Sequence, residues 1–202
     1  MKKTTIAAAA LALATAFGAS SAAYAQTGKT ETSTILSNVK NIGEIEVHGN
    51  VQVYLTTGEA DKVTVYNDYY AQNALVQEEK GVLRITSYNT DKLVVWITTA
   101  NLSKLSVYDN AEVKSFGRFS AIDLSVNLHG HALALLDMDA ISTTVAVSDR
   151  AFAALSGTAE KAALQLDPSA HALTGRLAAG TLTEKVNHRP GKHFRPMEFA
   201  SI

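Results

Sequence analysis

Apolar and polar residues alternate most clearly between residues 45 and 55. The apolar positions of this run are Ile45, Val47, Val51, Val53 and Leu55. A period of two over this length predicts a β-strand with one buried face. His48-Gly49-Asn50 interrupts the alternation and predicts a bend within the run.

Shorter apolar runs predict further strands before residue 100. No clean period is present in residues 68–77, where a loop or a short helix is expected, and residues 78–81 are typical of a turn. Residues 26–41 form a leader rich in Thr and Ser, which is expected either to be flexible or to cap the fold, so regular structure should begin at Ile42. The further strands are predicted at residues 62–66, 82–86 and 93–98.

The second half of the chain repeats a strand-like pair of apolar residues at a nearly constant interval. The pairs are Leu105/Val107, Leu124/Val126, Val145/Val147 and Leu164/Leu166. Small residues follow four positions after the second members, at Ala111, Gly130, Ala151 and Ala170. A fixed period of about 20 residues indicates a β-solenoid, in which each coil stacks on the one before it. We therefore predict one all-β domain over residues 42–186, a right-handed β-helix-like stack of short strands, with one coil per repeat.

Residues 1–25 have the pattern of a secretory signal peptide. Lys2 and Lys3 precede an apolar core at residues 6–17, and Ala23-Tyr24-Ala25 fits the small-x-small cleavage rule. A membrane anchor is the alternative, but that apolar core is shorter than the roughly 20 residues that a spanning helix needs. The sequence therefore predicts an exported bacterial protein that begins at Gln26, without a transmembrane segment, located in the periplasm, on the outer surface or in the medium.

Charge and cysteine content exclude several classes of protein. The formal net charge is −1, and removing Lys2 and Lys3 with the signal peptide makes it −3, which argues against a nucleic-acid binder. The chain contains no cysteine, which excludes a disulfide scaffold, a thiol enzyme and a cysteine-ligated metal site. The tail at residues 187–202 is basic when its histidines are counted. It is expected to be a solvated end, to cap the last coil or to contact an anionic envelope partner.

The order and spacing of several motifs resemble one known family. The motifs are I-x-V-x-G-x-V-x-V-x-L-x-x-G from Ile45 to Gly58, Gly81-Val82-Leu83-Arg84-Ile85, and Asn101-Leu102-Ser103-Lys104-Leu105-Ser106-Val107 before the repeated coils. Together they resemble the autotransporter adhesin head domain, or GIN domain, a family of exported bacterial domains of unknown function. The resemblance covers roughly residues 42–186. It implies a right-handed β-helix-like fold, and it supplies no catalytic residues.

Histidine and glutamate residues offer a weak candidate for a metal site. His129-Gly130-His131 would place two imidazoles on one face of an extended segment. Glu112, His131 and His171 share one offset in the predicted coils, although Phe152 in the intervening coil would separate the last two by about 9–10 Å. A closed zinc site needs three or four convergent ligands. No metal site is therefore expected, with Glu112, His131 and His129 as its only candidates.

Asp137-Met138-Asp139 offers two carboxylates for calcium or for acid–base chemistry. The preferred interpretation is a polar turn between coils, because calcium needs six to eight oxygen ligands. No nucleophile elbow, metalloprotease motif or phosphate-binding loop is present, so we expect no catalytic residue and no cofactor. An enzyme would have to use Asp137, Asp139, His129 and His131.

Tyrosines are the remaining candidates for a ligand surface. Tyr66, Tyr69, Tyr70 and Tyr88 could stack on sugar rings, although aromatic residues fill a core equally well. The sequence favours an exported, non-enzymatic module of the cell envelope, adhesin-like, that binds a glycan or protein or has a structural role. A homo-oligomer that covers an open coil is compatible with this prediction. A polysaccharide-processing enzyme on a β-helix scaffold and a periplasmic partner of a signalling or secretion system are the alternatives.

Overall fold

The computed structural model describes residues 33–36, 39–66 and 74–187. All described residues belong to one compact unit within residues 31–202. The predicted signal peptide, Tyr69, Tyr70 and the tail from residue 188 lie outside the described residues. The described part consists of strands and connecting segments without a helix, which confirms the predicted all-β class.

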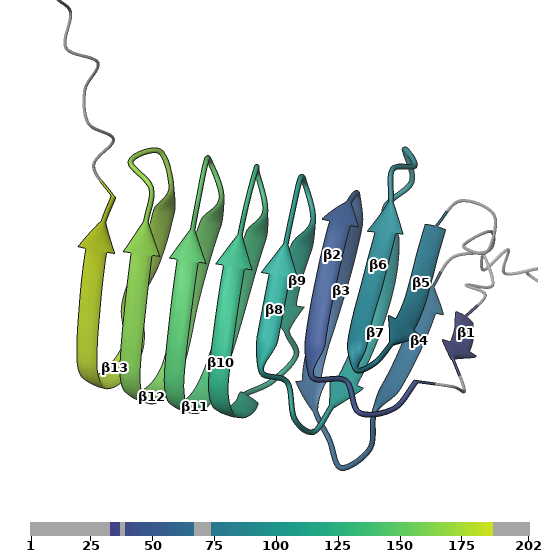
Figure 1. Ribbon diagram of the computed structural model, residues 1–202, viewed down its shortest axis with the longest axis horizontal. Coiled ribbons are helices and arrows are strands. Elements are labelled where there is room, and N and C mark those ends of the chain that lie inside the picture. Colours follow the sequence, from purple (N-terminus) through teal and green to yellow (C-terminus); the bar gives the residue numbers. More distant parts are fainter. Residues whose placement is uncertain (1–32, 37–38, 67–73, 188–202) are drawn as a thin grey trace, which may run out of the picture. The chain divides into compact units, whose positions relative to one another are not determined.

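Within the described residues, thirteen strands join in one sheet (Figure 1). Their bounds are β1 Ser33–Leu36, β2 Glu44–Gly49, β3 Val51–Thr57, β4 Lys62–Tyr66, β5 Ala74–Glu79, β6 Val82–Ser87, β7 Leu93–Thr99, β8 Lys104–Val107, β9 Glu112–Ser115, β10 Phe119–Leu128, β11 Leu133–Val147, β12 Phe152–Leu166 and β13 His171–Val186. In Figure 1 the long strands from β10 to β13 each curve back on themselves, so that each forms two legs joined by a bend.

The first strands largely follow the predicted alternation. Every second residue from Ile45 to Leu55 is buried, and β2 and β3 are separated by the expected bend at Asn50. The limits of other predicted segments were wrong. Regular structure already begins at β1, which pairs antiparallel with β4 and lies just before the buried Val39. Residues 74–77, expected in a loop or helix, and residues 78–79, expected in a turn, belong to β5, because antiparallel pairing with β6 satisfies their backbone groups.

Parallel pairing connects the later strands, but one of the predicted apolar pairs is out of register. Val126 and Leu128 align with Leu105 and Val107 on one side and with Val145 and Val147 on the other. The predicted alignment of Leu124/Val126 with these pairs is therefore wrong by two residues. Local alternation does not reveal this error, because a shift of two keeps the same face buried.

The change of register falls between β9 and β10. Lys114 on β9 pairs with Leu135, whereas Phe119 on β10 pairs with Met138. The segment that joins β9 to β10 is therefore two residues longer than the part of β11 beside it. From β11 onwards the predicted alignment is confirmed, since Val145 pairs with Leu164 and Val147 with Leu166.

Small residues stack where the turns lead into the next strand. Ala132 and Ala151 are buried at matching positions, whereas Gly130, predicted to join them, lies two residues earlier in a turn. Further in, Val113, Ala134 and Ala153 are paired across β9, β11 and β12. These residues belong to a single core cluster that also contains the inward residues of both legs. Burial of one face leaves the alternate residues of each leg pointing outward.

Candidate ligand-binding face

One outward-facing row of side chains crosses six strands in register. We call it the central row. It consists of Trp96 on β7, Tyr54 on β3, Lys114 on β9, Leu135 on β11, Ala154 on β12 and Leu173 on β13. On β3, β7, β11 and β12 the residues on either side are buried, so alternation alone places the row outward. The row therefore presents aromatic, cationic and apolar groups side by side on one face.

Three aromatic rings gather at the β7 end of this face. The rings of Tyr54 and Trp96 stack with centroids 4.7 Å apart and planes at 28°, and Phe116 lies 5.0 Å from Trp96 at 58°. The backbone N–H of Phe116 donates to the carbonyl of Leu55 over 2.8 Å, which holds this residue beside β3. The Phe116 side chain is 61% exposed. We call these three aromatic residues the aromatic patch; Phe116 is its most exposed member, and Tyr54 and Trp96 are half-buried.

Polar and charged groups border the aromatic patch. The Gln52 amide nitrogen donates to the Tyr54 hydroxyl over 2.9 Å. The Glu112 carboxylate lies 2.5 Å from the Lys92 ammonium and 3.2 Å from the Lys114 ammonium. The hydrogen bond from Lys92 is the main cause that lowers the pKa of Glu112 below its ordinary value. This carboxylate is therefore ionised and shared between two cations.

The lowered pKa of Glu112 predicts a pH-dependent contribution to stability. Ionised Glu112 should stabilise the fold above the ordinary carboxyl pKa, and this contribution should disappear as the pH falls through the lowered value. We expect Glu112→Gln to lower the free energy of unfolding by about 1 kcal/mol or less at neutral pH, because ion pairs that are partly exposed to water contribute little. Urea unfolding of both proteins at neutral and at strongly acidic pH measures the difference. A difference that stays constant on acidification would contradict this assignment.

A cavity lies at the β13 end of the same face. Its polar and charged lining residues are Ser115, Asp137, Ser156 and Arg176, and it also contacts Leu135, Ala154 and Leu173 of the central row. We call it the Asp137 cavity. Asp137 Oδ1 lies 3.8 Å from Arg118 Nε and has no hydrogen-bond partner among the described residues. The side chain as a whole remains 44% exposed, so part of the carboxylate stays open to solvent.

A β-bulge brings Arg176 to this cavity. Ala154 pairs with Leu173, but Ser156 pairs with Arg176, so β13 contains one extra residue between these two pairs. A bulge of this kind turns the following side chains relative to the partner strand. Arg176 consequently stands opposite Ser156 and lines the cavity.

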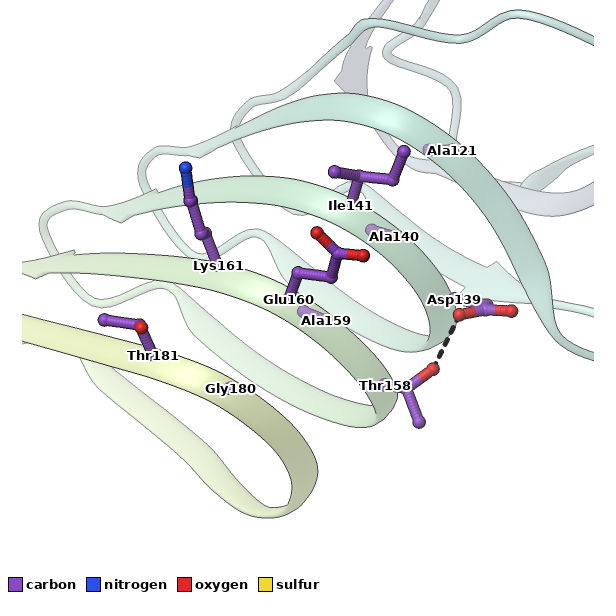
Figure 2. A pocket seen from close by; sticks show the side chains of 10 residues that line it. All are labelled: Ala121, Asp139, Ala140, Ile141, Thr158, Ala159, Glu160, Lys161, Gly180 and Thr181. Carbon is purple, nitrogen blue, oxygen red and sulfur yellow. Dashed lines mark hydrogen bonds between the residues drawn. The ribbon is translucent and has the colours of Figure 1, made fainter.

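Asp137 and Asp139 do not form a joint site. Both lie within β11, so the predicted polar turn is wrong, and the buried Met138 separates them. Asp139 lies in a second hollow over the bends of β10 to β13, where its Oδ1 accepts a hydrogen bond of 2.6 Å from the Thr158 hydroxyl (Figure 2). Figure 2 shows Ile141, Glu160 and Lys161 projecting from the strands around a floor of small residues. The two carboxylates therefore face different hollows.

The predicted metal candidates are also separated. Glu112 pairs in register with Leu133 and not with His131, because the coil between them is two residues longer than the repeat suggested. His131 follows Gly130, whose φ is +73°, so the predicted extended His-Gly-His face is absent. The ring of His129 stacks on Tyr108 with centroids 5.1 Å apart. In the described part of the chain, no group of three or more His, Cys, Asp or Glu side chains could hold a metal ion.

The candidate catalytic cluster is divided in the same way. His129 and His131 lie in the turn before β11, whereas Asp137 lies four residues beyond Leu133 along that strand. Four residues of extended chain span about 13 Å. The four residues on which an enzyme would depend therefore occupy separate places.

The predicted tyrosine surface is only partly represented in the described residues. Tyr66 lies on β4 and pairs with Val94, whereas Tyr88 lies in the turn after β6 with its hydroxyl 3.1 Å from the Asp109 carboxylate. That hydrogen bond raises the pKa of Tyr88. Tyr66 and Tyr88 thus have different surroundings. Sequence reasoning missed Tyr54 and Trp96, although both occupy outward positions of alternating strands, because the pairing of β3 with β7 cannot be read locally.

A second stack of rings lies on the other leg of the sheet. The ring of Tyr108 is sandwiched between His48 at 4.4 Å and His129 at 5.1 Å, all three nearly parallel. Asp109 supports the turn beside this stack, since its Oδ2 accepts hydrogen bonds from the Gly49 N–H and the Tyr88 hydroxyl, both at 3.1 Å. Both faces of the Tyr108 ring are therefore covered by the two imidazoles.

The later strands pair in parallel in one sheet, and a row of outward side chains crosses them. This arrangement defines the class of all-β proteins built from stacked strands. The chain belongs to the family described as "Putative auto-transporter adhesin, head GIN domain", whose model matches residues 42–189. The resemblance noted from the sequence motifs is thereby confirmed. No curated protein sequence matches the chain.

Solved structures share the fold at low sequence identity. A putative adhesin from Bacteroides fragilis has a TM-score of 0.67 at 17% identity, covering 79% of this chain and 77% of that one. A putative adhesin from Parabacteroides distasonis has a TM-score of 0.57 at 18% identity, covering 77% of both chains. A protein from Parabacteroides distasonis described as a putative lipid binding protein has a TM-score of 0.57 at 11% identity, covering 77% of this chain and 78% of that one.

Among the described residues, no helix is long and apolar enough to cross a membrane.

Proposed function

We propose that this protein is an exported, non-enzymatic, adhesin-like binding module of the cell envelope, and that it binds through the central row and the aromatic patch. Membership of an adhesin-like family supports the binding role. The observation that carries the proposal is the outward placement of three adjacent rings, Tyr54, Trp96 and Phe116, on a sheet whose other face is core. Exposed aromatic groups on a rigid surface are typical of binding sites.

The proposal includes export of the protein across the inner membrane. The pattern of residues 1–25 supports removal of a signal peptide and a mature protein that begins at Gln26, located in the periplasm, on the outer surface or in the medium. The stacked strands from residue 42 to 186 would form the binding domain. A right-handed winding of its coils is supported by the strong preference of parallel crossover connections for that hand, about 98%.

The test combines location with binding. Cells would be fractionated, intact cells treated with protease, and the N-terminus of the mature protein determined by mass. Purified protein would then be applied to intact cells and to extracellular-matrix coatings. We expect export with processing before Gln26, and surface binding that Phe116→Ala weakens about tenfold, equivalent to about 1.4 kcal/mol.

Two further variants control the test. Trp96→Ala should weaken binding at least as much, and circular dichroism would verify that both patch variants are folded. Leu75→Ala removes an apolar side chain that is 50% exposed on β5, away from the patch, and should leave binding unchanged. Retention of residues 1–25 in a cytoplasmic protein, or equal binding by the patch variants and the wild type, would overturn the proposal.

A further inference from the structure

We propose that the ligand of the central row is an extended acidic glycan, a chain of pyranose sugars that carries uronic-acid carboxylates. The chain would lie across the strands, stack on the aromatic patch at one end and reach the Asp137 cavity at the other. This inference rests on the proposed binding function and specifies its ligand class.

The dimensions of the face favour a polymer over a single sugar. Trp96 and Leu173 mark the two ends of the central row, and the intervening pairings are all in register. Five strand spacings separate β7 from β13, which amounts to about 24 Å. Leu135, Ala154 and Leu173 also line the Asp137 cavity, so the row and the cavity are continuous.

The aromatic patch suits the apolar face of a sugar ring. Aromatic rings carry negative charge on their faces and attract the weakly positive C–H groups that a pyranose presents on one side. Polar groups stand directly beside the rings, since Gln52 bonds Tyr54 and Lys114 follows Tyr54 in the central row. Sugar hydroxyls at the edge of a stacked ring would therefore find hydrogen-bond partners without a deep pocket.

The charges along the face favour an acidic ligand. Lys92 and Lys114 surround the single carboxylate of Glu112. Arg118 and Arg176 accompany the single carboxylate of Asp137. These residues comprise four cations and two carboxylates, although the chain as a whole has a formal net charge of −1. The excess of positive charge is complementary to carboxylates on the ligand, and a guanidinium can bind a carboxylate with two parallel hydrogen bonds.

The same charges disfavour an acyl chain. A lipid tail laid along the central row would remove the ammonium of Lys114 and the guanidinium of Arg176 from water without a compensating partner. A glycan leaves these groups hydrated or bonded, and its hydroxyls can donate to the exposed part of the Asp137 carboxylate.

Trp96 provides a direct readout, because it is the only tryptophan of the chain. Oligogalacturonate, alginate and hyaluronan oligomers would be titrated into the purified protein while its tryptophan fluorescence is recorded. Methyl-esterified oligogalacturonate provides the matched neutral ligand, since it keeps the sugar backbone and loses the charge. We expect at least one acidic oligomer to change the fluorescence, and its long forms to bind more tightly than its short forms.

Charge variants locate the binding. Lys114→Gln and Arg176→Gln should each weaken binding of the acidic oligomer about tenfold, which corresponds to about 1.4 kcal/mol. Lys185→Gln, on the second leg of β13, serves as the control and should bind like the wild type. Raising the salt concentration to about 0.5 M should weaken binding further, because exposed charges are screened.

Several outcomes would overturn the acidic-glycan inference. These are the absence of any fluorescence change with all three acidic oligomers, equal affinity for the methyl ester, and equal losses in Lys185→Gln and Arg176→Gln. If the protein binds cell surfaces through Phe116 while acidic oligomers do not compete, the inference fails and the proposed function stands. If a non-exported protein still binds acidic oligomers through Trp96, the proposed location fails and the inference stands.

Discussion

Replacing Gly157 with alanine is expected to lower the free energy of unfolding by about 3 kcal/mol or more. Gly157 has a φ of +100°, which L-residues rarely adopt. A Cβ atom at this position would lie 2.0 Å from the Met138 carbonyl oxygen and 2.7 Å from Asp137 Oδ1. Backbone strain and a collision with the neighbouring strand therefore both destabilise this variant. The collision also displaces the Asp137 carboxylate.

Gly117→Ala separates these two causes. Gly117 also has a positive φ, +78°, but a Cβ atom there would have no neighbour within 4 Å. We expect it to cost only the backbone strain, about 1 kcal/mol. Urea unfolding followed by Trp96 fluorescence and by circular dichroism measures both variants. Equal losses at the two glycines would contradict the assigned contact with Met138.

Phe119→Ala is expected to cost about 4 kcal/mol, as large-to-small changes in a packed core do. Phe119 is 1% exposed, is among the largest fully buried side chains and belongs to the central cluster. It also pairs in register with Met138, the residue that Gly157 contacts from the other side. A decrease of the melting temperature by about 10 °C should accompany this loss in a domain of this size.

Ile122→Ala is the matched control for Phe119→Ala. Ile122 lies three residues further along β10 but is 68% exposed, so its truncation should change stability by less than about 0.5 kcal/mol. A melting temperature that falls equally in both variants would show that the two strand faces are assigned wrongly. Together with Gly157→Ala, this pair tests whether packing around Met138 supports the strand that carries Asp137.

Local alternation was sufficient to predict many of the strands and the all-β class. The run from Ile45 to Leu55 was read correctly, including the bend at Asn50, because side chains of a strand alternate strictly between two environments. The motif order from Ile45 to Val107 was sufficient for the family, and the repeat of apolar pairs matched the parallel pairing of β11 with β12. These features depend on residues that are close together in the sequence, so they can be predicted without knowing the tertiary structure.

Register and long-range pairing were decided only by the tertiary structure. A coil two residues longer than the repeat moved Glu112 away from His131 and into line with Leu133, and the sequence pattern looks the same in either alignment. Residues 74–77 became a strand because β6 supplied their hydrogen-bond partners. Tyr54 and Trp96 became neighbours because β3 and β7, which are distant in the sequence, pair in the sheet, and this contact depends on how the whole sheet folds.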